Sequence, residues 1–93
     1  MMDYPCKSRL LRYFENGPLW DYESVDKLVS EEGRKDAYFR WTARFWLMEM
    51  SGGGVLDVIE EGIDDGSHFG EGKLISKYRL TDYGRMRIKE LLE

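Results

Sequence analysis

Residues 73 to 84 read KLISKYRLTDYG, and they carry the clearest structural pattern in the chain. Every second residue from Leu74 to Leu80 is apolar or small, and two of the three residues between them are charged. This period of two is typical of a strand with one buried face. Thr81 or Asp82 can cap a helix that follows at once. The stretch therefore predicts a strand that leads directly into a closing helix.

A second strand-like run lies upstream, where residues 55–59 read VLDVI. Two strand-like runs joined by a short polar segment predict a β-hairpin. The connection over residues 60–72 holds four glycines, and it is long for a hairpin turn. We therefore expect a hairpin whose loop has a mobile tip.

Three helices are predicted before the hairpin, from apolar residues that recur with helical spacing. They cover residues 7–16, 25–32 and 37–50, and the closing helix covers residues 82–92. Ser24 is the expected N-cap of the second helix, and Gly33 is a suitable residue to end it.

The third helix carries the residues that matter most for function. At 100° per residue, its larger side chains cluster on one side, which we expect to face the core. These are Tyr38, Trp41, Phe45 and Met48. Arg40 and Arg44 fall nearly opposite that cluster, so we expect them to face solvent.

The predicted fold is α+β: a single domain over residues 1–93, with three helices, a two-stranded hairpin and a C-terminal helix. Within it, the run from Tyr78 to Gly84 resembles the Y-x-L-T-x-x-G junction of MarR-like and PadR-like winged helix-turn-helix regulators of prokaryotes. The resemblance implies a winged-helix fold in which residues 60–72 are the wing. It also implies a DNA-binding transcriptional regulator whose partner is double-stranded DNA.

In that arrangement the third helix, residues 37–50, reads the major groove. Residues 34–47 carry four basic side chains and one acidic one, and arginine suits both guanine edges and phosphates. Arg40 and Arg44 would then read bases, while phosphates would be held by Arg34, Lys35, Lys73 and Lys77. The alternative is that the two arginines only solvate the outer face of a core helix.

The expected wing departs from the family pattern in its charge. Residues 57–72 hold six acidic side chains and no lysine or arginine, whereas residues 73–89 hold six basic side chains and one acidic one. Carboxylates beside phosphates repel, with only partial screening by salt. The alternative function is therefore a protein-interaction winged helix without DNA binding, whose acidic wing contacts a basic partner.

Surplus apolar residues predict a homodimer, because two copies would match two DNA half-sites. Phe39, Trp46 and Met50 lie on a flank of the third helix and, with the first and last helices, are the expected interface.

Other chemistry is not indicated. Cys6 is the only cysteine, and His68 with its neighbouring carboxylates matches no metal spacing. No catalytic triad or phosphate-binding loop is present, so we expect neither an enzyme nor a cofactor. The net charge is −4, and no signal peptide or membrane-spanning run is seen, which predicts a cytoplasmic protein without membrane contact.

Overall fold

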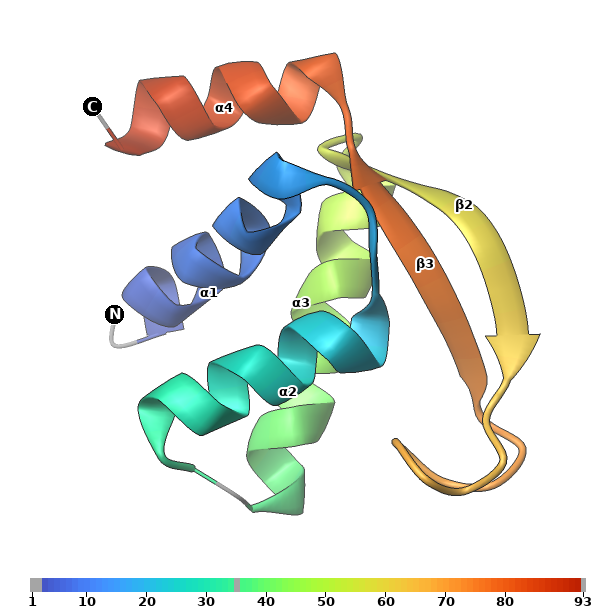
Figure 1. Cartoon of the computed structure of the whole chain (residues 1–93). Helices are drawn as coiled ribbons and strands as arrows, with labels where there is room; N and C mark the ends of the chain where they lie inside the picture. The colour runs from blue at the N-terminus through green and yellow to red at the C-terminus, as the bar shows by residue number, and fades with distance from the viewer. Residues whose placement is uncertain (1–2, 35, 93) are drawn as a thin grey trace.

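The computed structural model describes residues 3–34 and 36–92. Over these residues the chain forms four α-helices, one 3-10 helix and three strands, which makes the protein α+β as predicted (Figure 1). In chain order the elements are α1 (Asp3–Arg12), η1 (Tyr13–Asn16), β1 (Leu19–Trp20), α2 (Asp21–Glu32), α3 (Ala37–Gly52), β2 (Leu56–Ile63), β3 (Leu74–Leu80) and α4 (Asp82–Leu92).

The sheet is antiparallel and has the strand order β1-β3-β2. β2 and β3 are the predicted hairpin, and they pair from one end of β2 to the other. β1 joins the free edge of β3, with Leu19 opposite Tyr78 and Trp20 opposite Lys77. The prediction of two strands was therefore wrong by one, because a two-residue strand is too short to show a period of two.

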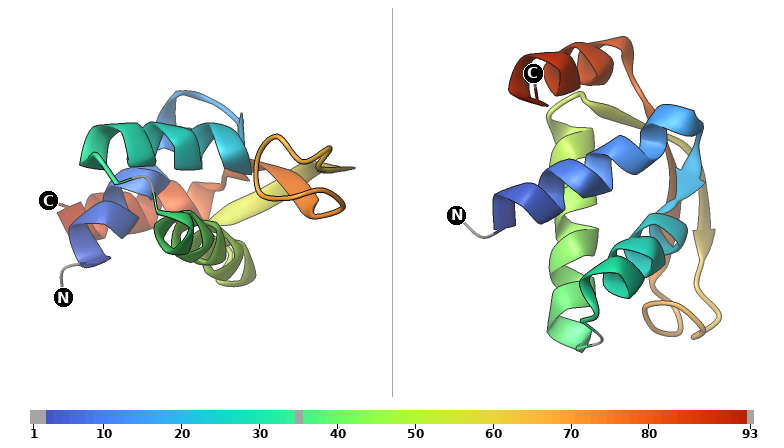
Figure 2. Two further views of the ribbon diagram at one scale, coloured as in Figure 1. Left: turned by 90° about the horizontal axis from the view of Figure 1, so that it is seen from below. Right: turned by 60° about the vertical axis from the view of Figure 1, so that its left-hand side comes forward.

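The helices gather on one side of the sheet, and α4 returns from the end of β3 to lie beside α1 (Figures 1 and 2). The core fills the space between α1, α2, α3 and the inner face of the sheet. Its buried apolar side chains are Leu10, Leu11, Phe14, Val25, Leu28, Phe39, Ala43, Trp46, Leu47, Met50, Leu56, Tyr78, Leu80 and Ile88.

α2 begins four residues earlier than predicted. Asp21 opens the helix, and the carboxylate of Glu23 accepts a hydrogen bond from the backbone N–H of Trp20 at 2.8 Å. Ser24 is buried in the first turn, where its hydroxyl donates to the Asp21 carbonyl at 2.9 Å, so it is not the N-cap. The helix starts here because β1 fixes the preceding residues against β3.

The face of α3 that packs into the core is not the predicted one. Phe39, Ala43, Trp46, Leu47 and Met50 are buried. The residues that we expected in the core are exposed: Tyr38 by 77%, Phe45 by 58%, Met48 by 50% and Trp41 by 41%. Both sets recur with helical spacing, so periodicity could not rank them. The buried set lies on the side of α3 against which α1, α2 and β2 pack.

The junction between β3 and α4 follows the sequence pattern closely. Tyr78 and Leu80 are buried, and the Thr81 hydroxyl caps α4 by accepting from the backbone N–H of Gly84 at 2.8 Å. The same hydroxyl donates to the Gly54 carbonyl at 2.7 Å. This network ties the start of α4 to the turn after α3. Within the described ranges, no helix combines the length and apolar character needed to cross a bilayer.

Candidate interaction surface

The loop that joins β2 to β3 folds around one buried carboxylate. Asp64 is 2% exposed, and its two oxygens accept four hydrogen bonds from the loop backbone. The donors are the N–H groups of Gly66 at 3.1 Å, His68 at 3.3 Å, Phe69 at 2.5 Å and Gly70 at 2.8 Å. The hairpin loop, residues 64–73, therefore closes on its own aspartate, an arrangement that the sequence did not predict.

These hydrogen bonds change the acidity of Asp64. Burial acts to raise its pKa, but the four backbone N–H groups stabilise the charged form and lower the pKa to about 2. An ordinary aspartate titrates near a pKa of about 3.9. The ionised form is therefore part of the folded loop.

The order of the hairpin loop should consequently depend on pH. Because the folded pKa lies below the unfolded one, the stabilisation is complete above about pH 4 and is lost as the pH falls towards 2. The protection of the Phe69 and Gly70 amides against hydrogen exchange, relative to the intrinsic exchange rate at each pH, should fall over this window. Asp65, whose pKa is lowered by the Ser67 hydroxyl, also titrates there, so the control is Asp64→Asn. That variant should already exchange fast at pH 6; slow exchange would contradict the role of the Asp64 charge.

The hairpin loop packs against α2 and α3. The His68 ring stacks on Tyr22, with ring centroids 3.6 Å apart and planes 8° apart, and Tyr22 stacks in turn on Trp20. Phe69 faces α3, where the guanidinium groups of Arg40 and Arg44 each lie 5.3 Å from its ring. The hairpin loop therefore lies directly against α2 and α3.

The two arginines that we expected to read DNA bases contact the hairpin instead. Arg40 pairs with Asp26 at 2.5 Å and donates to the His68 carbonyl at 3.1 Å. Arg44 donates to the Leu74 carbonyl at 2.9 Å. The Nε atom of Arg44 is buried and has no partner within residues 3–34 and 36–92. Neither guanidinium projects freely from α3.

The other four expected phosphate contacts are scattered. Arg34 is exposed and pairs with Asp36 at 3.5 Å, while Lys35 lies outside the described residues. Lys73 sits 5.1 Å from the centre of the Trp41 ring. Lys77 alternates with buried residues of β3 and therefore lies on the sheet face away from the helices. Of the five expected residues that the structure describes, Arg40, Arg44 and Lys73 gather around the rings of Phe69 and Trp41.

The exposed side chains of α3 form an apolar surface on one side of the helix. We call Tyr38, Trp41, Phe45 and Met48 the α3 face. Val58, Ile63 and Leu74 of the hairpin are also exposed, and Met48, Val58 and Leu74 line one cavity of about 190 Å³. The α3 face and the hairpin are therefore continuous.

Two ionisable groups lie at the side of this cavity. Asp21 and Arg44 both line it. Burial raises the pKa of Asp21, although the backbone N–H groups of Ser76 and Tyr22 oppose the shift. The Asp21 carboxylate accepts from Ser76 N–H at 3.0 Å, which connects α2 to β3. The sequence showed no sign of this contact, which spans 55 residues.

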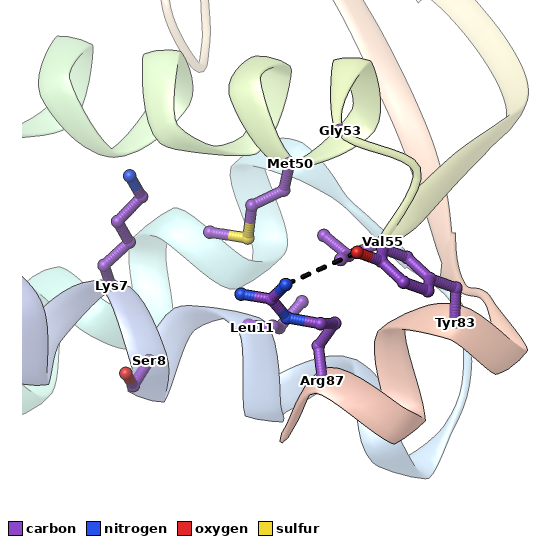
Figure 3. Close-up of a pocket in the computed structure, with 8 residues that line it drawn as sticks. All are labelled: Lys7, Ser8, Leu11, Met50, Gly53, Val55, Tyr83 and Arg87. Atoms are coloured by element: carbon purple, nitrogen blue, oxygen red, sulfur yellow. Dashed lines mark hydrogen bonds between the residues drawn. The ribbon is translucent and has the colours of Figure 1, made fainter. Parts of the chain in front are cut away.

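A second hollow, of about 370 Å³, lies between α1 and α4 (Figure 3). Leu11, Met50 and Val55 form apolar walls, and Arg87 points inward and donates to the Tyr83 hydroxyl at 3.4 Å.

The dimer interface that we expected from Phe39, Trp46 and Met50 was wrong, because all three side chains are buried in the core.

The described residues contain no group of three or more histidine, cysteine, aspartate or glutamate side chains arranged to hold a metal ion. Comparisons of the chain with protein-family models, curated proteins and solved structures found no match.

Proposed function

We propose that this protein is a winged-helix domain that binds another protein chain through the α3 face. The observation that carries the proposal is the exposure of four large apolar side chains on one side of the third helix. Large contiguous exposed apolar surfaces mark interaction sites on soluble proteins. Aromatic residues and methionine are the side chains that protein interfaces favour.

The winged-helix assignment rests on the order of the elements and on the junction after β3. Three helices precede a hairpin, and Thr81 of the Y-x-L-T-x-x-G pattern caps α4 by accepting from the backbone N–H of Gly84 directly after β3. These features support a winged helix, in which α3 occupies the position of the recognition helix.

The surroundings of α3 favour protein over DNA as the partner. Arg40 and Arg44 are engaged with the hairpin, and the four exposed residues of the α3 face are apolar. The hairpin beside it carries Glu60 and Glu61 in exposed positions. DNA affinity depends on neutralising phosphates, and these groups cannot do so.

A peptide selection tests the proposal. Random helical peptides would be selected on the protein immobilised at low density, with Phe45→Glu as the comparison. We expect enriched peptides with apolar residues at helical spacing, and loss of their binding to Phe45→Glu. Met86→Glu, at a similarly exposed methionine of α4, should bind them normally. Equal binding to Phe45→Glu would show that the α3 face is not the site.

DNA binding as a transcriptional regulator is the second candidate, and the resemblance of residues 78–84 favours it. Arg34 at the start of α3 and Lys73 in the hairpin loop are both exposed and could meet phosphates. This candidate expects duplex DNA to bind with an affinity in about the micromolar range that falls steeply between low and high salt. Fluorescence anisotropy with a random duplex at two salt concentrations measures it. An absence of binding at low salt would exclude it.

A further inference from the structure

The α3 face has the spacing of a helix-pairing seam. Its four residues, at positions 38, 41, 45 and 48, are separated by three, four and three residues, which is the alternation of the a and d positions of a heptad repeat. Such a seam is complementary to another helix with the same spacing. We propose that the chain bound on the α3 face is a second copy of this protein, with the two α3 helices antiparallel; this rests on the proposed function.

The charged groups around the seam are of both signs. None of its four positions is charged, although the Lys73 ammonium and the Arg44 guanidinium lie 5.1 and 5.2 Å from the centre of the Trp41 ring. Glu49, at its edge, pairs with Lys7 of α1 at 3.2 Å, and Arg44, at the other edge, donates to the Leu74 carbonyl. Glu61 of the hairpin lines the same cavity as Arg44. Like charges directly opposed across an interface would disfavour pairing. Glu49 is already paired within its own copy, and Glu61 is a negative charge on the same surface as the basic Arg44.

The apolar area is sufficient for a stable dimer. Large side chains of this kind present about 200 Å² each when fully exposed, so the four side chains of the α3 face present roughly 450 Å² at their observed exposures. The exposed Val58, Ile63 and Leu74 raise the patch to roughly 700 Å². Two copies would bury roughly 1,400 Å², which falls within the range of about 1,200–2,000 Å² for specific interfaces.

The antiparallel direction follows from the ends of α3. In a parallel pair the positive ends of the two helix dipoles would lie together, and the dipoles would be aligned. In an antiparallel pair each N-terminus meets the C-terminal end of the other helix. Tyr38 then lies against the partner's Met48, and Trp41 lies against the partner's Phe45. A helix paired in this way cannot also enter a DNA groove.

Analytical ultracentrifugation of two matched variants tests the interface. Met48 on α3 and Met86 on α4 are 50% and 48% exposed, so a glutamate at either position is tolerated by the fold. We expect the wild type to be a dimer. Met48→Glu should associate at least about 100-fold more weakly, because a charge enters an apolar interface. Met86→Glu should associate as strongly as the wild type. A monomeric wild type at about 100 μM would overturn the proposal. So would dissociation by Met86→Glu alone, since it would place the interface on the terminal helices.

A mixing experiment tests the direction of the pair. Tyr38→Glu and Met48→Arg should each be monomeric, because each places a charge in the seam. Mixed in equal amounts, they should form a dimer, since only the antiparallel arrangement sets the glutamate of one chain against the arginine of the other. If both variants are monomeric and the mixture stays monomeric, the antiparallel pairing is wrong.

The outcomes separate this inference from the proposed function. A monomeric wild type that still selects peptides through Phe45 overturns the second copy as partner and leaves the α3 face as a protein-binding site. A monomer that selects no peptides through Phe45 overturns both.

Discussion

Replacement of Gly84 with alanine is expected to lower the free energy of unfolding by about 3 kcal/mol, which is a large share of the 5–15 kcal/mol typical of a domain. A Cβ atom at this position would lie 2.3 Å from the Val55 carbonyl oxygen and 2.7 Å from the Leu80 Cδ1 atom. The first of these is a backbone atom, so no change of rotamer can relieve the contact. α4 would have to move away from Val55, and this movement would break the Thr81 cap. Urea denaturation of the variant and the wild type measures the difference.

Gly52 supplies the matched control for this substitution. It is the last residue of α3, a Cβ atom there would meet nothing within 4 Å, and its φ is not positive. Gly52→Ala should therefore leave stability unchanged or raise it by up to about 1 kcal/mol, because alanine favours the helix. If the two alanine variants unfold at the same urea concentration, the close approach of α4 to Val55 does not exist in solution.

Truncation of Leu47 is expected to have the second large effect. Leu47 is fully buried in the core, and Leu→Ala at such a site costs about 2–5 kcal/mol through lost burial and the cavity left behind. Met48, the next residue, is half exposed, so Met48→Ala should cost less than about 0.5 kcal/mol in the monomer. Thermal or urea unfolding at a protein concentration where both variants are monomeric gives the comparison.

The pair of variants also decides which face of α3 packs into the domain. A larger loss for Met48→Ala than for Leu47→Ala would restore the face that the helical pattern predicted, with Tyr38, Trp41 and Phe45 in the core. The α3 face would then disappear as an interaction surface, and both proposals for it would fall together.

Local patterns predicted the C-terminal part of the fold well. The strand ending at Leu80 and the helix capped by Thr81 follow from alternation and capping, which involve residues close in the chain. The positions of α1, α3 and the hairpin were likewise predicted to within a few residues. β1 and the earlier start of α2 were missed, since Leu19 and Asp21 owe their states to contacts with β3, about 55 residues away.

The candidate site was less accessible to sequence reasoning. Arg40 and Arg44 were placed on the solvent side of α3, whereas the folded loop around Asp64 engages both of them. A single buried aspartate with four backbone donors leaves no periodic signal. The sequence showed an acidic run before residue 72 and a basic run after it, but it did not show which of these charged groups pair within the folded domain.

By itself, the sequence determined an α+β domain with helices, a hairpin and a capped closing helix, because these elements depend on neighbouring residues. The tertiary structure alone decided which of two apolar stripes on α3 is buried. Both stripes have the same helical spacing, and only the packing of α1, α2 and β2 against one of them distinguishes core from surface. The stripe left outside, from Tyr38 to Met48, is the surface on which the proposed function rests.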